Sequence, residues 1–187
     1  MTMLVLGVLL FATVHFIPSL APDIKANAVR RIGDWGYKGI FSLLLLAAFG
    51  LMIMGWRDAD PAFLYSTPPG LHKFVLCLLL VAFWLMAVSA RKSRVRLLVR
   101  HPQLTGVALW GISHLLLNGD SRAIVLFGGM TVWSLIEIVA ISHREGVWIK
   151  SGTPSWSTEV VTVVIAAIMI GLIVTAHPWL SGVPVSW

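Results

Sequence analysis

The chain has 187 residues, of which 58% are hydrophobic and 12% are charged. A typical soluble domain is about 45–50% apolar and about 25% charged. A soluble domain of this size has too much surface for its volume to bury so many apolar side chains. The composition therefore excludes a soluble globular protein. Uncharged runs at residues 41–54 and 160–176 indicate an all-α integral membrane protein with one transmembrane domain over residues 1–187.

Six segments are long and apolar enough, or nearly so, to cross a hydrocarbon layer about 30 Å thick. They are residues 2–20, 36–56, 71–90, 103–118, 122–142 and 158–179. The fourth segment is short and contains a histidine. Only Asn118, Gly119 and Asp120 separate it from the fifth, so these two segments are expected to form a helical hairpin. The alternative is a bundle of five spans in which one of the two enters the membrane only partly.

The net charge of +6 is concentrated in alternate connections between the segments. The connections after the first, third and fifth segments hold Lys25, Arg30, Arg31, Lys38, Arg91, Lys92, Arg94, Arg96, Arg100, Arg144 and Lys150, whereas the other side holds Arg57, Lys73 and Arg122. By the positive-inside rule the first side is cytoplasmic, so both termini are expected on the non-cytoplasmic side. Membrane topology thus accounts for the basic charge, with lipid head groups rather than nucleic acid as its partner.

The chain has one cysteine, Cys77, inside an apolar run. A single cysteine excludes an intramolecular disulfide, a CxxC pair and a CxxCH site for covalent haem. We expect the Cys77 side chain to pack in the core.

Ionisable side chains inside a membrane are costly and usually functional, and three fall within the predicted spans: His15, His114 and Glu137. His15 lies in the inner half of the first span, and His114 lies about 18 Å from the cytoplasmic start of the fourth. The two histidines therefore lie at different nominal depths in the membrane, and a tilt of a helix could bring them to the same depth. Imidazoles from two helices could be the axial ligands of a non-covalent, b-type haem. The alternative is a pair of neutral histidines hydrogen-bonded across helices.

The surroundings of these residues leave further alternatives open. His114 shares a helix face with Trp110, and Gly106 and Gly111 leave room for a neighbouring helix or for a flat ligand. Glu137 could make a structural hydrogen bond, hold a proton, pair with a basic side chain or relay protons. The remaining histidines fall nearer the span ends, where water can solvate them: His72, His101, His143 and His177.

The block RHPQLTGVALWGISHLLLNGD at residues 100–120, the first-helix histidine and the stretch YKGIFSL at residues 37–43 resemble the NnrU family. These small bacterial membrane proteins are linked by name and context to nitric oxide and denitrification. The resemblance implies a multi-pass protein of the bacterial inner membrane. The family is itself similar to the plastid and cyanobacterial 15-cis-zeta-carotene isomerase, a membrane enzyme that carries a b-type haem and isomerises a cis double bond in a redox-dependent way.

The resemblance also implies which residues would hold a haem. The two histidines associated with haem ligation in the isomerase match His15 and His114 by motif, and the histidine of the RHP motif matches His101. Trp110, the tryptophan that precedes the second ligand, joins them as a cofactor-binding residue. The isomerase can also offer a cysteine three residues before the second ligand, where this chain has Gly111 and hence no thiolate.

Three functions follow as expectations. The resemblance implies a b-type haem protein in nitric oxide or denitrification physiology, in which one axial histidine must leave before nitric oxide binds. The first alternative is a haem-dependent cis–trans isomerase of a carotenoid or another polyene, with Trp84, Trp110 and Trp133 lining the path of the apolar substrate. The second is a cofactor-free accessory protein of the membrane.

Overall fold

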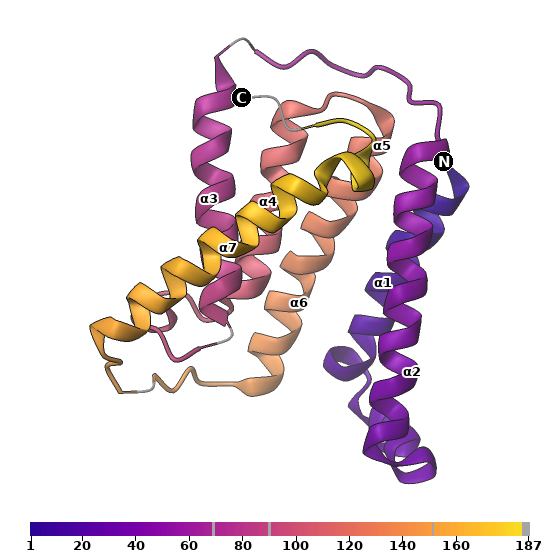
Figure 1. Ribbon diagram of the computed structural model, residues 1–187. Coiled ribbons are helices and arrows are strands. Elements are labelled where there is room, and N and C mark those ends of the chain that lie inside the picture. The colour runs from indigo at the N-terminus through magenta and orange to yellow at the C-terminus, as the bar shows by residue number, and fades with distance from the viewer. Residues whose placement is uncertain (69, 90, 151, 185–187) are drawn as a thin grey trace.

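The computed structural model describes residues 1–68, 70–89, 91–150 and 152–184. These residues form helices and connecting loops, with no strand among them (Figure 1). The elements are α1 (Thr2–Leu20), α2 (Pro22–Asp58), α3 (Leu71–Ser89), the 3-10 turn η1 (Arg94–Leu97), α4 (Pro102–Leu117), α5 (Ser121–Ala123), the π turn η2 (Ile124–Gly128), α6 (Gly129–Glu145) and α7 (Trp156–Ser181). Because α5, η2 and α6 follow one another without a break, they form one rod, the α5–α6 rod.

Within the described residues, five helices are long and apolar enough to cross a membrane: α1, α2, α3, the α5–α6 rod and α7. The remaining helix, α4, has 16 residues, which is about 24 Å of helix rise. The predicted all-helical membrane fold is therefore confirmed. The number of spans and the side of the membrane that holds the termini stay predictions. The indole of Trp56, near the end of α2, donates a hydrogen bond to the carbonyl of Ser181 (3.2 Å), which ties the end of α7 to the end of α2.

The helix that contains the second predicted span begins earlier in the structure than the sequence indicated. Helix α2 starts at Pro22, a residue suited to the first helical turn. Gly33 interrupts it with a φ of 75° and a ψ of 166°, a conformation that residues with a side chain rarely adopt. Residues 22–32 therefore form a separate, largely exposed helical stretch with its own direction, and the apolar span follows the break.

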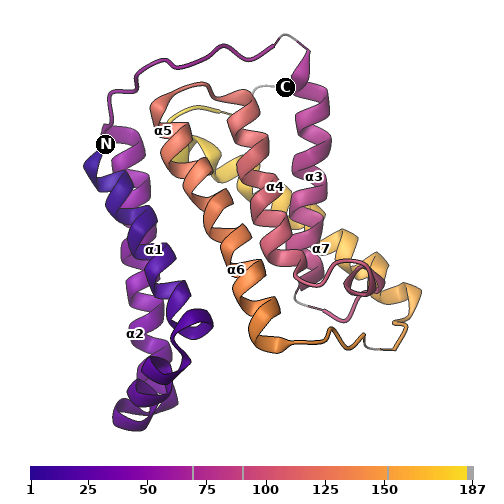
Figure 2. The same cartoon turned by 180° about the vertical axis from the view of Figure 1, so that it is seen from behind.

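The helices pack in two groups that meet along the α5–α6 rod (Figures 1 and 2). In the first group α1 lies against α2, and a Cβ added at Gly55 would come within 2.7 Å of the Leu4 Cα atom. In the second group α4 lies between α3 and α6, and α7 crosses α3 on the outer face. Small residues at these contacts allow the helix backbones to approach each other closely.

The predicted hairpin between the fourth and fifth segments is confirmed. Helix α4 ends at Leu117, and the carboxylate of Asp120 caps α5 by accepting a hydrogen bond from the Ala123 amide (2.9 Å). The extended segment before α3 holds this turn in place, because the Leu64 amide donates to the Gly119 carbonyl (2.8 Å).

The expectation that Cys77 packs in the core is wrong, because its side chain is exposed on α3. Val75, two positions earlier and so on the other side of the helix, is fully buried. The apolar run around Cys77 therefore supplies both a packed face and an outward face. In a membrane protein the outward face meets lipid.

Candidate functional site

His15 lies on α1 in an aromatic environment. Its Nδ1 atom hydrogen-bonds to the Phe11 carbonyl one turn earlier (3.0 Å), so Nδ1 carries the proton in the neutral ring. Its ring lies 4.2 Å from the ring of Phe11, 5.4 Å from that of Phe41 and 5.0 Å from that of Trp133, between centroids. No hydrogen bond from the described residues reaches its Nε2 atom.

His114 on α4 repeats this arrangement with other partners. Its Nδ1 atom hydrogen-bonds to the Trp110 carbonyl (2.9 Å), and its ring stacks on Phe127 with 4.3 Å between centroids and 25° between planes. The Trp110 ring lies 5.0 Å from both His114 and Phe127. Here, too, Nε2 has no hydrogen-bond partner in the part of the chain that the structure describes. Each imidazole thus offers an unprotonated nitrogen, which is the form that ligates a metal.

The structure keeps the two histidines at different depths, as their positions in the sequence suggested. Their aromatic partners, Trp133 and Phe127, are six residues apart on the α5–α6 rod, which is about 9 Å of helix rise. No ring contact joins His15 to His114 among the described residues. Each histidine therefore contacts the same rod separately, His114 near its beginning and His15 near its middle.

A third imidazole, His177 on α7, was not expected near the site. It lies near His114. Its Nδ1 atom is also engaged, by the Ser181 hydroxyl (3.0 Å) and the Val183 carbonyl (2.7 Å). The topology could have indicated this proximity, because the fourth and sixth predicted spans end on the same side of the membrane.

The two glycines near His114 accommodate neighbouring helices rather than a flat ligand. A Cβ added at Gly106 would lie 2.6 Å from the Ala82 carbonyl oxygen of α3. At Gly111 it would lie 2.7 Å from the Phe127 carbonyl oxygen and closer still to the Thr131 hydroxyl. The position at which the isomerase carries a cysteine is therefore a tight contact between α4 and the α5–α6 rod.

His101 lies at the opposite end of α4, apart from His114. Its Nε2 atom hydrogen-bonds to the Ser142 hydroxyl (2.9 Å) near the end of α6. Burial holds the pKa of His101 below its ordinary value, the Glu145 carboxylate raises it and Arg100 and Arg96 lower it. His101 is placed to join the start of α4 to the end of α6, and it does not share a site with His114.

Glu137 makes a structural hydrogen bond, one of the alternatives that its position left open. The Ser19 hydroxyl of α1 donates to its Oε1 atom (3.0 Å). Glu137 is 3% exposed, and its buried Oε2 atom has no hydrogen-bond partner in the part of the chain that the structure describes. The carboxyl group therefore joins α6 to α1 through one oxygen and leaves the other unengaged.

The donor set restricts the kind of metal centre that these residues can hold. No cluster of three or more histidine, cysteine, aspartate or glutamate side chains that could hold a metal ion occurs within residues 1–68, 70–89, 91–150 and 152–184. A bare ion such as zinc takes three or four protein ligands, whereas a haem iron takes four nitrogens from its macrocycle and one or two from the protein. In donor chemistry His15 and His114 therefore fit a haem better than a bare ion.

Comparison with known proteins identifies the family. The sequence model of the NnrU protein family matches residues 3–185. The chain belongs to the NnrU family. The match extends beyond the resemblance found in the motifs, because it includes α7. Comparisons with curated proteins and with solved structures found no match to this NnrU-family chain.

Proposed function

We propose that this NnrU-family chain is a b-type haem protein of the bacterial inner membrane, in which His15 and His114 would hold the iron. The observation that carries the proposal is the state of the two imidazoles. Each hydrogen-bonds through Nδ1 to a carbonyl of its own helix, and its Nε2 atom has no partner among the described residues. A hydrogen bond of this kind fixes the tautomer and the orientation of a ligating histidine.

The two ligands come from different helix groups. His15 belongs to the α1–α2 pair and His114 to the α3–α4 group, and their partners on the α5–α6 rod lie at different depths. Ligation of one iron by both histidines would therefore require the two imidazoles to reach the same level along the rod. Trp133 contacts the His15 ring, and Phe127 stacks on the His114 ring. A haem held here would supply an iron that changes redox state and that binds nitric oxide once one histidine is released.

The role in nitric oxide or denitrification physiology is part of this proposal and rests on the family. The isomerase alternative has less support, because its predicted aromatic path is not continuous. Trp110 and Trp133 border one apolar cluster, whereas no ring contact joins Trp84 to either of them among the described residues. The three indoles therefore do not form a single lining for a polyene.

The test is the absorbance spectrum of protein purified from haem-replete cells. We expect a Soret band that shifts with dithionite and with nitric oxide, and that is lost or displaced in His15→Ala and in His114→Ala. His72→Ala, near the start of α3, serves as the matched control and should keep the wild-type band. A colourless wild-type protein, or a band that neither substitution alters, would falsify the assignment.

A further inference from the structure

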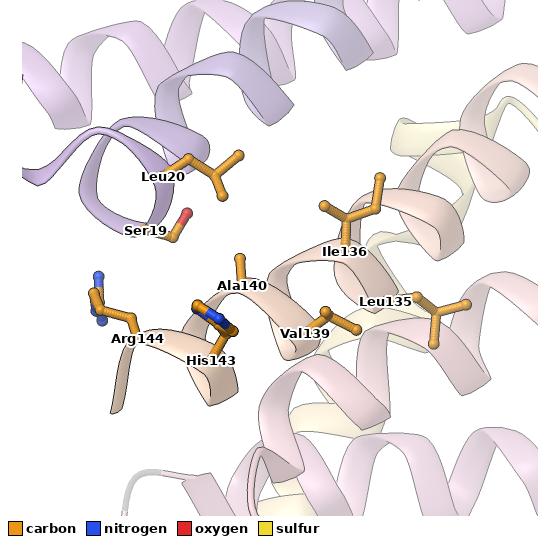
Figure 3. A pocket seen from close by; sticks show the side chains of 8 residues that line it. All are labelled: Ser19, Leu20, Leu135, Ile136, Val139, Ala140, His143 and Arg144. Atoms are coloured by element: carbon orange, nitrogen blue, oxygen red, sulfur yellow. The ribbon is translucent and has the colours of Figure 1, made fainter. Parts of the chain in front are cut away.

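A cleft of about 630 Å³ separates the end of α1 from the second half of α6 (Figure 3). Its walls are mostly apolar, and it opens toward the outside of the bundle, because Val139 is 68% exposed and Leu135 is 50% exposed. The cleft is lined by Ser19, Leu20, Leu135, Ile136, Val139, Ala140, His143 and Arg144. Both helices are long and apolar enough to span a membrane, so an opening between them would face the lipid. Neither His15 nor His114 lines it.

One end of the cleft carries hydrogen-bonding groups from both helices. Ser19 contributes its hydroxyl from α1, and α6 contributes the imidazole of His143 and the guanidinium of Arg144 (Figure 3). Behind Ser19 lies the buried carboxyl of Glu137, whose Oε2 atom has no partner within the described residues. A buried polar atom without a partner is unfavourable unless a ligand or a proton completes it. This end is therefore suited to the polar head of an amphipathic molecule.

The charges at this end favour a neutral head group over an anionic one. The Arg144 guanidinium already donates to the Pro18 carbonyl and lies 3.9 Å from the Glu145 carboxylate. A phosphate would meet a cation that already donates to the Pro18 carbonyl and pairs with the Glu145 carboxylate, whereas a carbonyl oxygen needs only hydrogen-bond donors. Ser19 and His143 supply such donors from opposite walls.

We propose that this cleft binds the head group of a membrane quinone, with its isoprenoid tail in the lipid. The Ser19 hydroxyl donates to one quinone oxygen, and His143 donates to the other. When Glu137 is protonated it donates to the Ser19 oxygen, which frees the hydroxyl proton for the ligand. Leu20, Ile136 and Val139 contact the ring and the first part of the tail.

The proposed quinone site does not depend on the proposed haem, although the two sites are neighbours. Ser19 follows His15 by one helical turn, and its hydroxyl also lies 3.4 Å from the His15 carbonyl. A quinone in the cleft would therefore lie next to the helix turn that carries a proposed haem ligand. The binding test below uses no property of a haem, so its outcome and that of the absorbance test are separate.

The experiment measures retention of decylubiquinone by the protein in nanodiscs of phosphatidylcholine, with bound quinone quantified by chromatography. Val139→Trp fills the cleft from its exposed side, and we expect it to weaken binding at least tenfold. Ser19→Ala removes a donor and should weaken binding by about tenfold. The matched control is Val132→Trp, which changes an equally lipid-facing residue of α6 (57% exposed) outside the cleft and should bind as the wild type does.

The readout separates the proposal from the other occupants of such a cleft. Circular dichroism and gel filtration establish that each variant is folded. Because Val139 is exposed, its substitution tests the cleft even where Ser19→Ala disturbs the contact between α1 and α6. Equal binding by Val139→Trp and Val132→Trp overturns the proposal. Displacement of the quinone by phosphatidylglycerol added to the discs also overturns it and assigns the cleft to an anionic lipid.

Discussion

The contact between α4 and the α5–α6 rod at Gly111 leaves no room for a side chain, and Gly111→Ala should destabilise the protein. The added Cβ would lie 2.7 Å from the Phe127 carbonyl oxygen, whereas ordinary van der Waals contact begins at 3.4 Å. The Thr131 hydroxyl lies closer still, and it cannot easily turn away because it donates to the same carbonyl (2.7 Å). One of the two obstacles is backbone, so relief requires the helices to separate.

Overpacking of this kind costs about 1–3 kcal/mol, and we expect a loss of that size in the free energy of unfolding. The measurement is unfolding in mixed micelles with increasing SDS, followed by circular dichroism. Gly111→Ala/Thr131→Ala removes the hydroxyl obstacle and should recover only part of the loss, because the Phe127 carbonyl remains. The variant should also disturb the stacking of His114 on Phe127.

The matched control is Gly50→Ala, in the interior of α2. A Cβ at Gly50 meets nothing within 4 Å, so this substitution should be neutral or should stabilise the helix by about 0.5–1 kcal/mol. Equal stability of Gly111→Ala and Gly50→Ala would refute the reasoning. It would mean that α4 and the rod do not approach each other as closely as the structure places them.

Two further predictions concern the end of the bundle that holds the basic loops. Burial holds the pKa of His101 below its ordinary value of 6.5, so the unfolded chain binds more protons there, and the free energy of unfolding should fall as the pH drops below 6.5. His101→Gln, which can still bond to Ser142, should reduce this loss of stability between pH 7.5 and pH 5 when unfolding in SDS is measured. An unchanged pH profile would show that His101 is not the group responsible. The Glu159 carboxylate accepts hydrogen bonds from the Ser93 hydroxyl (2.8 Å) and the Arg94 amide (2.7 Å). In the same assay, Glu159→Gln should therefore lower the free energy of unfolding by about 1–2 kcal/mol. A stability equal to that of the wild type would show that these hydrogen bonds contribute little.

The helices themselves could be predicted because each depends on a local property of the sequence. The first and third predicted spans match α1 and α3 to within a residue, since uninterrupted apolar residues of the right length are sufficient to specify them. The break at Gly33 was missed. A glycine is compatible with a continuous helix, and only its backbone angles in the folded chain reveal the change of direction.

The candidate site could be predicted only in part, because it depends on how helices pair. His15 and His114 stood out as ionisable residues within apolar segments, and their different depths followed from their distance to the span ends. Their partners, Trp133 and Phe127, did not follow, because no local pattern states which faces of two helices meet. The bond between Ser19 and Glu137 spans 118 residues and was unpredictable for the same reason.

The π turn η2 gives the rod a place where chain length can vary. A π turn holds one more residue than the α-helical turn it replaces and is how a helix absorbs a single insertion without turning its remaining faces. Deletion of one residue within Ile124–Gly128 would restore ordinary α-helical geometry and leave Trp133 and Glu137 facing α1. A deletion elsewhere in the rod would rotate those faces by about 100°. Among relatives of this protein, single-residue length differences in the rod should therefore concentrate in these five positions.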